Sequence, residues 1–462
     1  MSDQMTNRLK ESAVIRWSTL MLISVVMFAS YYFYDVFSAI KQVLQQELGF
    51  TNAEYGMMVG YYSFTNFFLG MTVFGGIILD KWGIRKTGIM FISFMTLGAF
   101  FTAYGASETF NNGGLGYGFL NSIITSYSPA LKLMVLGRLL FGLGAETLYV
   151  VINKIMVKWF KNKELALAFG INLAIARFGT AAALIFSPKI VNWSPDWSNA
   201  GWFGFMLMII AFISFLFYMI MDRKFDTASG GKVELDPEDE FKFSDVVDLL
   251  KNRAFIYITM LCVTFYSAVF PFISYAPDFL HNKFGFSLEA SGQIATILPY
   301  GTIIFTPLFG WVVDKKGKSA SLMFIGSLLL IIVHFSLSLT SLTPYFAIFF
   351  LGVAFSLVPA AMWPAVAKIV EENKLGTAYG FMFFIQNFGL FLFPWLVGKV
   401  LDITNPGVTA EMVRTSDLTF DYTWAIFMLG VLGFLGLIFA YLLKRQDKIN
   451  KLGLELPSNE SH

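Results

Sequence analysis

The sequence predicts an all-α integral membrane protein, with about twelve transmembrane helices in two halves of six. Composition, the recurrence of long apolar stretches and an internal repeat lead to this prediction. Of the 462 residues, 56% are hydrophobic and only 14% are charged, whereas soluble domains carry about a quarter charged residues. A water-soluble core of this length cannot hide so much apolar surface, but a lipid bilayer can accommodate it.

The apolar stretches have the length that a membrane span requires, which is about 20 residues for a helix. Polar connectors separate them, and the longest of these are 108–130, 223–253 and 403–421. The predicted helices are 16–40, 54–79, 88–107, 131–157, 166–188, 200–222, 254–276, 288–313, 320–340, 345–368, 376–401 and 422–443.

The polar segment 223–253 divides the chain into three parts. Residues 1–222 form a first bundle of six helices, 223–253 a linker, and 254–462 a second bundle of six helices with a tail. The first part of the linker is rich in Gly, Asp and Glu, which is typical of flexible connectors. Its second part, FKFSDVVDLLKNR, carries a partial apolar stripe and predicts a short helix on the membrane surface.

The two halves repeat each other at matching helix positions. GIILDKWG at 76–83 ends the second predicted helix, and GWVVDKKG at 310–317 ends the eighth. LALAFG at 165–170 opens the fifth, and LGTAYG at 375–380 opens the eleventh. Secondary transporters are often built from such repeats, with the substrate site between them near the membrane midplane.

Extending the repeat pairs individual positions of the two halves. The fourth and tenth helices align so that Glu146 corresponds to Ala360 and Tyr149 to Trp363. In the fifth and eleventh helices, Arg177 corresponds to Asn387.

Basic residues predict the orientation, because Lys and Arg accumulate in cytoplasmic connectors. With the N-terminus inside, connectors 81–86, 158–163 and 315–318, the linker and the C-terminal tail hold most of the 33 basic residues. An even number of helices then places both termini in the cytoplasm.

Several motifs resemble those of a known transporter superfamily. GIILDKWGIR at 76–85 and RLLFGLG at 138–144 resemble signature motifs of the major facilitator superfamily. GRLLFGLGAE at 137–146, WFKNKELALAFG at 159–170 and LGTAYGFMFFIQNFG at 375–389 resemble its branch of lysosomal dipeptide transporters. The resemblance implies the major facilitator fold, with a central substrate cavity, and uniport of dipeptides by alternating access. The chain lacks that branch's N-terminal acidic dileucine signal, so we expect a bacterial relative in the inner cell membrane rather than the lysosomal one.

Glu146 and Arg177 are the leading candidates for substrate binding, because ionisable residues deep in a membrane are functional by default. Each lies twelve residues from a predicted cytoplasmic loop, which places both at about 18 Å depth on neighbouring helices. They could form a structural salt bridge between these helices. Alternatively, they could bind a zwitterion, with Glu146 on the ammonium and Arg177 on the carboxylate. The resemblance favours the second interpretation, because the dipeptide branch places both residues in its site.

Six further residues are candidate lining residues of the substrate cavity. The repeat register or their depth in a helix selects each of them, although packing alone explains most buried aromatic side chains. They are Tyr62, Asn66, Tyr266, Trp363, Gln386 and Asn387.

Five charged residues are candidates for gating or coupling. Asp80 and Asp314 end predicted helices, where a carboxylate can cap the N-terminus of a neighbouring helix. Resemblance to the superfamily implies that they hold the cytoplasmic side shut, on helix eleven and helix five respectively. Arg85 belongs to the same motif. Arg138 either links helices or assists proton movement. Asp35 could be a gate residue, a proton site or a partially hydrated surface carboxylate.

Three functions compete: a dipeptide facilitator, a proton-coupled transporter of a sugar or organic anion, and a non-transporting receptor on the same scaffold. Enzymatic motifs do not occur, so we expect no enzyme. The single cysteine, Cys262, has no ligand cluster around it, and we expect no metal and no cofactor. A net charge of +2 gives no reason to expect nucleic acid. We expect the partners to be a small solute and the lipid bilayer, and the protein to be a monomer.

Overall fold

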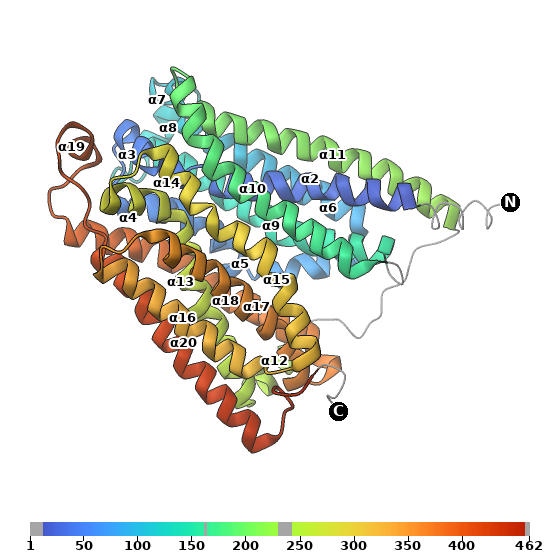
Figure 1. Cartoon of the computed structure of the whole chain (residues 1–462). Coiled ribbons are helices and arrows are strands. Elements are labelled where there is room, and N and C mark those ends of the chain that lie inside the picture. The colour runs from blue at the N-terminus through green and yellow to red at the C-terminus, as the bar shows by residue number, and fades with distance from the viewer. Residues whose placement is uncertain (1–12, 161–163, 230–242, 458–462) are drawn as a thin grey trace.

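The computed structural model describes residues 13–160, 164–229 and 243–457, and these residues form helices without any strand. Eleven helices in this part of the chain are long and apolar enough to cross a membrane. The prediction of an all-α membrane protein is therefore confirmed. Each half of the chain forms one bundle, as Figure 1 shows.

The first half contains long helices joined by short helical segments. Its elements are α2 (Ala13–Asp35), η1 (Ser38–Ile40), α3 (Lys41–Leu48), α4 (Asn52–Gly60), η2 (Tyr61–Ser63), α5 (Phe64–Phe68), α6 (Met71–Ala106), α7 (Glu108–Asn111), α8 (Tyr117–Ser122), α9 (Pro129–Phe160), α10 (Leu165–Trp193) and α11 (Asn199–Ser229).

The second half begins after a short helix. Its elements are α12 (Phe243–Leu249), α13 (Arg253–Phe284), α14 (Leu288–Ala295), α15 (Ile297–Lys316), α16 (Ser319–Leu339), α17 (Pro344–Ile369), η4 (Glu372–Lys374), α18 (Leu375–Thr404), α19 (Ala410–Thr415) and α20 (Thr423–Asn450).

The second predicted span, 54–79, is not one continuous helix, which explains eleven continuous spans where we expected twelve. It consists of α4, η2, α5 and the first part of α6, with a left-handed residue at Gly70. Gly83, at φ 76° and ψ 170°, then divides α6 into two helices. The Thr87 hydroxyl donates to the carbonyl of Ile78 at 3.4 Å, whereas nine residues of straight helix rise about 13.5 Å. The chain therefore reverses at Gly83 and starts the third span.

The linker is partly helical. α11 continues beyond the predicted end at residue 222 to Ser229, and the expected short helix is α12. The stretch 230–242, expected to be a flexible connector, lies outside the described residues.

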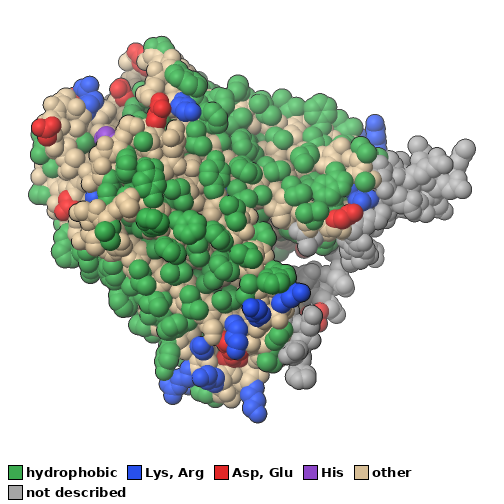
Figure 2. Space-filling view, in the orientation of Figure 1, with side chains coloured by type: hydrophobic (Ala, Val, Ile, Leu, Met, Phe, Trp, Pro, Cys, Tyr) green, Lys and Arg blue, Asp and Glu red, His purple; other side chains and the backbone are tan. Residues whose placement is uncertain are grey.

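The long helices turn apolar side chains outward along their middle. On α11 these side chains recur every three or four residues, which is the spacing of one helix face. They are Met206, Ile209, Ile210, Ile213, Leu216, Phe217 and Ile220. Figure 2 shows hydrophobic side chains over the middle of the visible face and charged ones toward its ends. This pattern suits a protein surrounded by lipid.

The two bundles meet at one end and diverge toward the other (Figure 1). They meet around α3, α4 and α14, on the side remote from both termini, and we call this the closed end. The opposite end, where α9 ends and α12 lies, we call the terminal end.

Candidate functional site: a central cavity between two halves

A buried ion pair joins the halves at the closed end. Lys41 of α3 lies 2.6 Å from Asp278 of α13, and both side chains are almost completely buried. The Lys41 ammonium also donates to the amide oxygens of Gln45 at 2.8 Å and Asn52 at 2.7 Å. Four aromatic rings surround it with centroids at 5.3–6.0 Å, which is the range of cation–π attraction; they are Tyr55, Tyr275, Phe420 and Tyr422.

Hydrogen bonds extend this closure to α4 and α18. The Asp402 carboxylate of α18 accepts from the backbone N–H groups of Asn52 and Ala53 at 3.0 and 2.9 Å. These are orphan donors at the first turn of α4, where the helix dipole favours an anion. The Tyr275 hydroxyl donates to the carbonyl of Pro394 at 2.9 Å. At the closed end, polar groups of both halves therefore have hydrogen-bond partners across the interface.

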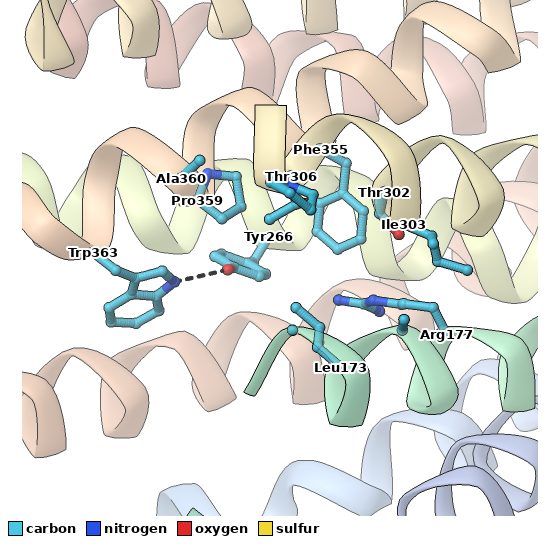
Figure 3. A pocket seen from close by; sticks show the side chains of 13 residues that line it. Leu173, Arg177, Tyr266, Thr302, Ile303, Thr306, Phe355, Pro359, Ala360 and Trp363 are labelled. Atoms are coloured by element: carbon cyan, nitrogen blue, oxygen red, sulfur yellow. Dashed lines mark hydrogen bonds between the residues drawn. The ribbon is translucent and has the colours of Figure 1, made fainter. Parts of the chain in front are cut away.

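A cavity of about 420 Å³ lies between α10 of the first half and α13, α15 and α17 of the second (Figure 3). Its position between the halves, toward the terminal ends of α10 and α17, is the one the repeat predicts for a substrate site. Its lining consists of Gly170, Leu173, Ala174, Arg177, Tyr266, Thr302, Ile303, Thr306, Pro307, Phe355, Pro359, Ala360 and Trp363.

Arg177 supplies the only charge in this lining. Its guanidinium carbon lies 5.0 Å from the ring centroid of Phe355 and 5.4 Å from that of Tyr31. Within the described part of the chain it makes no ion pair, and its Nε is buried without a hydrogen-bond partner. Two aromatic faces therefore hold the guanidinium at the cavity wall, and its donors remain available for a carboxylate.

Tyr266 and Trp363 form the opposite wall. The Trp363 indole N–H donates to the Tyr266 hydroxyl at 3.1 Å, as the dashed line in Figure 3 marks. Trp363 also stacks on Phe383 with centroids 4.7 Å apart. Because the Tyr266 oxygen accepts this bond, its own O–H proton can be donated to a ligand.

Glu146 lies outside this lining, in a neighbouring cluster of tyrosines. Its carboxylate accepts a hydrogen bond from the Tyr62 hydroxyl at 3.0 Å. The close approach of α9 to η2 makes this contact possible, since a Cβ at Gly142 would lie 1.8 Å from the carbonyl oxygen of Tyr62. Glycine at this position therefore places the acid beside the interruption in the second span.

The structure keeps Glu146 and Arg177 apart. No ion pair joins them among the residues described, so the structural salt bridge is not formed in this conformation. Aromatic rings connect the two regions, because Tyr149, about one helical turn from Glu146, packs on Tyr31 at 5.9 Å, and Tyr31 contacts Arg177. Two packed tyrosine rings, those of Tyr149 and Tyr31, thus lie between the acid and the base.

The remaining predicted lining residues lie in helix contacts. Asn66 donates to the carbonyl of Gly142 at 3.5 Å. Gln386 contacts the Cys262 thiol at 3.7 Å, and Asn387 donates to the carbonyl of Phe383 at 2.9 Å. The side-chain carbonyl oxygens of Asn66 and Asn387 are buried without a partner.

Arg138 is buried and clamps the end of α2. It donates to the carbonyls of Phe33 and Tyr34 at 3.3 and 3.0 Å, which are acceptors that the last turn of a helix leaves free. Asp35 is also buried there, and one of its carboxylate oxygens has no hydrogen-bond partner. Arg138 therefore links α9 to α2, which is one of the two roles considered for it.

Of the predicted gate residues, Asp80 contacts a helix of its own half in this conformation. Asp80 pairs with Lys154 of α9 at 2.9 Å rather than with the start of α18. Asp314 is exposed near the end of α15. Arg85 lies 3.0 Å from Asp222 of α11, so it holds two helices of the same half together. In this conformation the terminal end therefore lacks the expected Asp80 contact to α18.

Sequence reasoning missed the Lys41–Asp278 pair, Tyr31 and Phe355. A signal for the pair existed, because Lys41 and Asp278 each adjoin a long apolar run. Tyr31 and Phe355 carry no such signal, since aromatic residues are abundant throughout, with 52 Phe and 19 Tyr.

Two bundles joined at one end around a central cavity define a membrane transporter. Residues 20–394 match the Major Facilitator Superfamily, and the chain belongs to this family.

The chain is similar to named relatives in this family. It is 31% identical over 401 residues to the human lysosomal dipeptide transporter MFSD1, covering 84% of this chain and 80% of that protein. It is 23% identical over 389 residues to the hexuronate transporter of Bacillus subtilis (strain 168), covering 78% of this chain and 82% of that one.

Solved structures share the fold. A point mutant of the nucleoside transporter NupG superposes with a TM-score of 0.69 at 14% identity, covering 92% of this chain and 99% of that chain. A bacterial homolog of the human lysosomal transporter Spinster, in an inward-facing and occupied conformation, gives 0.66 at 15% identity, covering 94% and 98%.

Proposed function

We propose that this protein transports small zwitterionic solutes, above all dipeptides, by alternating access. One observation carries this proposal: Arg177 lines the central cavity, Glu146 lies in the adjoining tyrosine cluster, and the two opposite charges do not pair with each other. Leaving buried charges unpaired is costly, and a ligand with an ammonium and a carboxylate would satisfy both. The relatives named as dipeptide transporters support the same substrate class.

The conformation fits one stage of an alternating-access cycle. The basic connectors lie at the terminal end, so we assign this end to the cytoplasm, with both termini in the cytoplasm and the protein in the inner cell membrane. The structure then corresponds to an inward-facing state whose outer side is shut by Lys41 and Asp278. Asp80 and Asp314 would serve as cytoplasmic gate residues in the opposite state, which explains why Asp80 has a different partner here.

We favour uniport over proton coupling. The clamp that Arg138 forms on α2 gives it a structural role, and the proposal gives Glu146 the role of binding the ammonium of the solute. Glu146 and Asp35 are the residues on which a proton-coupled mechanism would rest. Uptake by proteoliposomes distinguishes uniport from proton coupling when it is measured with the same pH on both sides of the membrane and with a pH difference across it. A uniporter accumulates no dipeptide when a proton gradient is imposed.

Thermal stabilisation of the purified protein tests the substrate class, because a ligand that binds only the folded state raises its stability. We expect free dipeptides to raise the melting temperature more than free amino acids or acetylated, amidated dipeptides. Hexuronates, galactarate, glucarate and sugars serve as the comparison set, since two relatives are named as a hexuronate transporter and a probable galactarate/D-glucarate transporter. Equal shifts from blocked and free dipeptides would refute the zwitterion site, and shifts from hexuronates alone would favour an organic-anion transporter.

A further inference from the structure

The internal repeat assigns different charges to the two halves around the cavity. Glu146 and Arg177 of the first half correspond to Ala360 and Asn387 of the second. Ala360 lines the cavity, and so does Trp363, the counterpart of Tyr149. Repeat-related positions thus carry charge in one half and none in the other.

The part of the cavity formed by the second half is apolar. Ile303, Phe355, Pro359, Ala360 and Trp363 surround it, and Thr302, Thr306 and, at its edge beside Trp363, Tyr266 supply its hydroxyl groups. The Thr302 hydroxyl already donates to the carbonyl of Pro299 at 2.7 Å. This region therefore offers van der Waals contact but no counter-ion other than Arg177.

The position of Arg177 determines which part of a dipeptide enters this region. The guanidinium projects from α10 into the cavity beneath Phe355 (Figure 3), whereas Glu146 lies outside the lining, next to Tyr62. A carboxylate on Arg177 leaves the Cα of the C-terminal residue within the cavity. Since Glu146 binds the ammonium in the proposed function, the N-terminal residue extends toward Tyr31 and Glu146, away from the second half.

We infer that the first half binds the two charged termini of the dipeptide, while the second half binds the C-terminal side chain in an apolar subsite. This inference rests on the proposed function and adds a positional specificity to it. Neutral apolar side chains gain contact at the C-terminal position. Charged ones lose hydration there without gaining a partner, whereas the N-terminal position tolerates both kinds.

Pairs of dipeptides with the same composition and opposite order test this directly in the wild-type protein. We expect Ala-Leu to compete for uptake at least as well as Leu-Ala. Ala-Lys and Ala-Asp should compete roughly tenfold or more weakly than Lys-Ala and Asp-Ala, which is the discrimination expected of an apolar pocket. Both members of each pair carry the same net charge, so a difference reports position alone.

The Ala360→Glu variant sharpens the test, with Ala360→Gln as a control of equal size. We expect Ala360→Glu to improve competition by Ala-Lys relative to Ala-Leu by about tenfold, and Ala360→Gln to leave that ratio near the wild-type value. The isomer pairs decide the question even if a variant does not fold. Equal competition within every pair, or selectivity at the N-terminal residue, would overturn the subsite and leave dipeptide transport intact. Absence of any dipeptide uptake would overturn the proposed function as well.

Discussion

Two pairs of opposite charges occupy the interior of this transporter, and their surroundings differ. Lys41 and Asp278 touch across the interface between the halves at 2.6 Å. Glu146 and Arg177 belong to one half and do not touch. Among the described residues, the Lys41 ammonium has three oxygen partners, whereas Glu146 receives one hydrogen bond, from Tyr62, and Arg177 lies against two aromatic rings.

Under the proposed function, this difference separates a gate from a binding site. A buried pair whose hydrogen bonds are all made is stable in one conformation, and opening it costs free energy. Buried charges without partners destabilise the empty protein, and that cost is recovered when a ligand supplies the missing groups. The same chemistry can therefore close one end of the protein and receive solute in the centre.

The largest effect is expected from replacing both central charges. Glu146→Gln together with Arg177→Gln should reduce dipeptide uptake about a thousandfold or more, since truncating each charged partner of a ligand costs about 2–5 kcal/mol and about 1.4 kcal/mol corresponds to a factor of ten. The double variant should not regain what the single variants lose, because the two side chains have no ion pair to relieve. Uptake by proteoliposomes measures this, with the melting temperature as the control for folding.

Arg177→Lys is the matched control for this prediction. It keeps the positive charge and loses the planar fork that binds a carboxylate bidentately. We expect intermediate uptake from it. Wild-type uptake by the double variant would contradict the binding role and make Glu146 and Arg177 dispensable for transport.

The closed end should behave in the opposite way. Lys41→Met or Asp278→Leu alone leaves a buried charge without its partner, which costs about 3–5 kcal/mol. We expect a lower melting temperature and an opened outer side for each single variant. The double variant should recover most of the stability, because apolar side chains of similar volume often replace a buried ion pair at no cost.

Spin labels at Glu47 and Met412 can follow the opening, since both residues are exposed on opposite halves. In a background with Cys262→Ala, the distance between labels should lengthen in the single variants and shorten again in the double variant. If the labels in the single variants stayed as close as in the wild-type protein, the Lys41–Asp278 pair would not be what holds the outer side shut.

Hydropathy and repeats were sufficient to predict the helical architecture, because a spanning helix must be long and apolar. They could not predict the break at η2 and Gly70, since the sequence around it is as apolar as a continuous helix. The ends of some helices also differ from the predicted ones. α13 runs to Phe284, eight residues past the predicted end, and this extension carries Asp278 into contact with Lys41.

For the candidate site too, the sequence was sufficient to predict some features and not others. Depth counted along helices pointed to Glu146 and Arg177, and the structure places Arg177 in the cavity lining and Glu146 in the adjoining tyrosine cluster. The rotation of each helix about its axis decides what lines the cavity, and apolar sequences specify it poorly. Gln386 and Asn387 therefore face their neighbours instead of the cavity, whereas Phe355 reaches Arg177.

The smallest effect concerns the hydroxyl group that Tyr62 donates to Glu146. This bond at 3.0 Å is the only hydrogen bond to the carboxylate among the described residues, and in the proposed site it orients the acid that binds the ammonium of the dipeptide. Tyr62→Phe removes one oxygen and keeps the ring, which packs edge-on against Tyr34 at 4.8 Å. Loss of a hydrogen bond to a charged group costs about 1.5–3 kcal/mol, and a ligand ammonium compensates part of this. We therefore expect dipeptide affinity to fall roughly fivefold to tenfold, with little change in melting temperature.

Tyr32→Phe on α2 is the control, since the Tyr32 hydroxyl is buried without a partner and its removal should leave affinity unchanged. Titration of the purified variants with one dipeptide measures both values. If Tyr62→Phe bound dipeptides as tightly as Tyr32→Phe, Glu146 would not need this bond to meet the ammonium, and the space between Glu146 and Arg177 would lose its acidic end as a binding element.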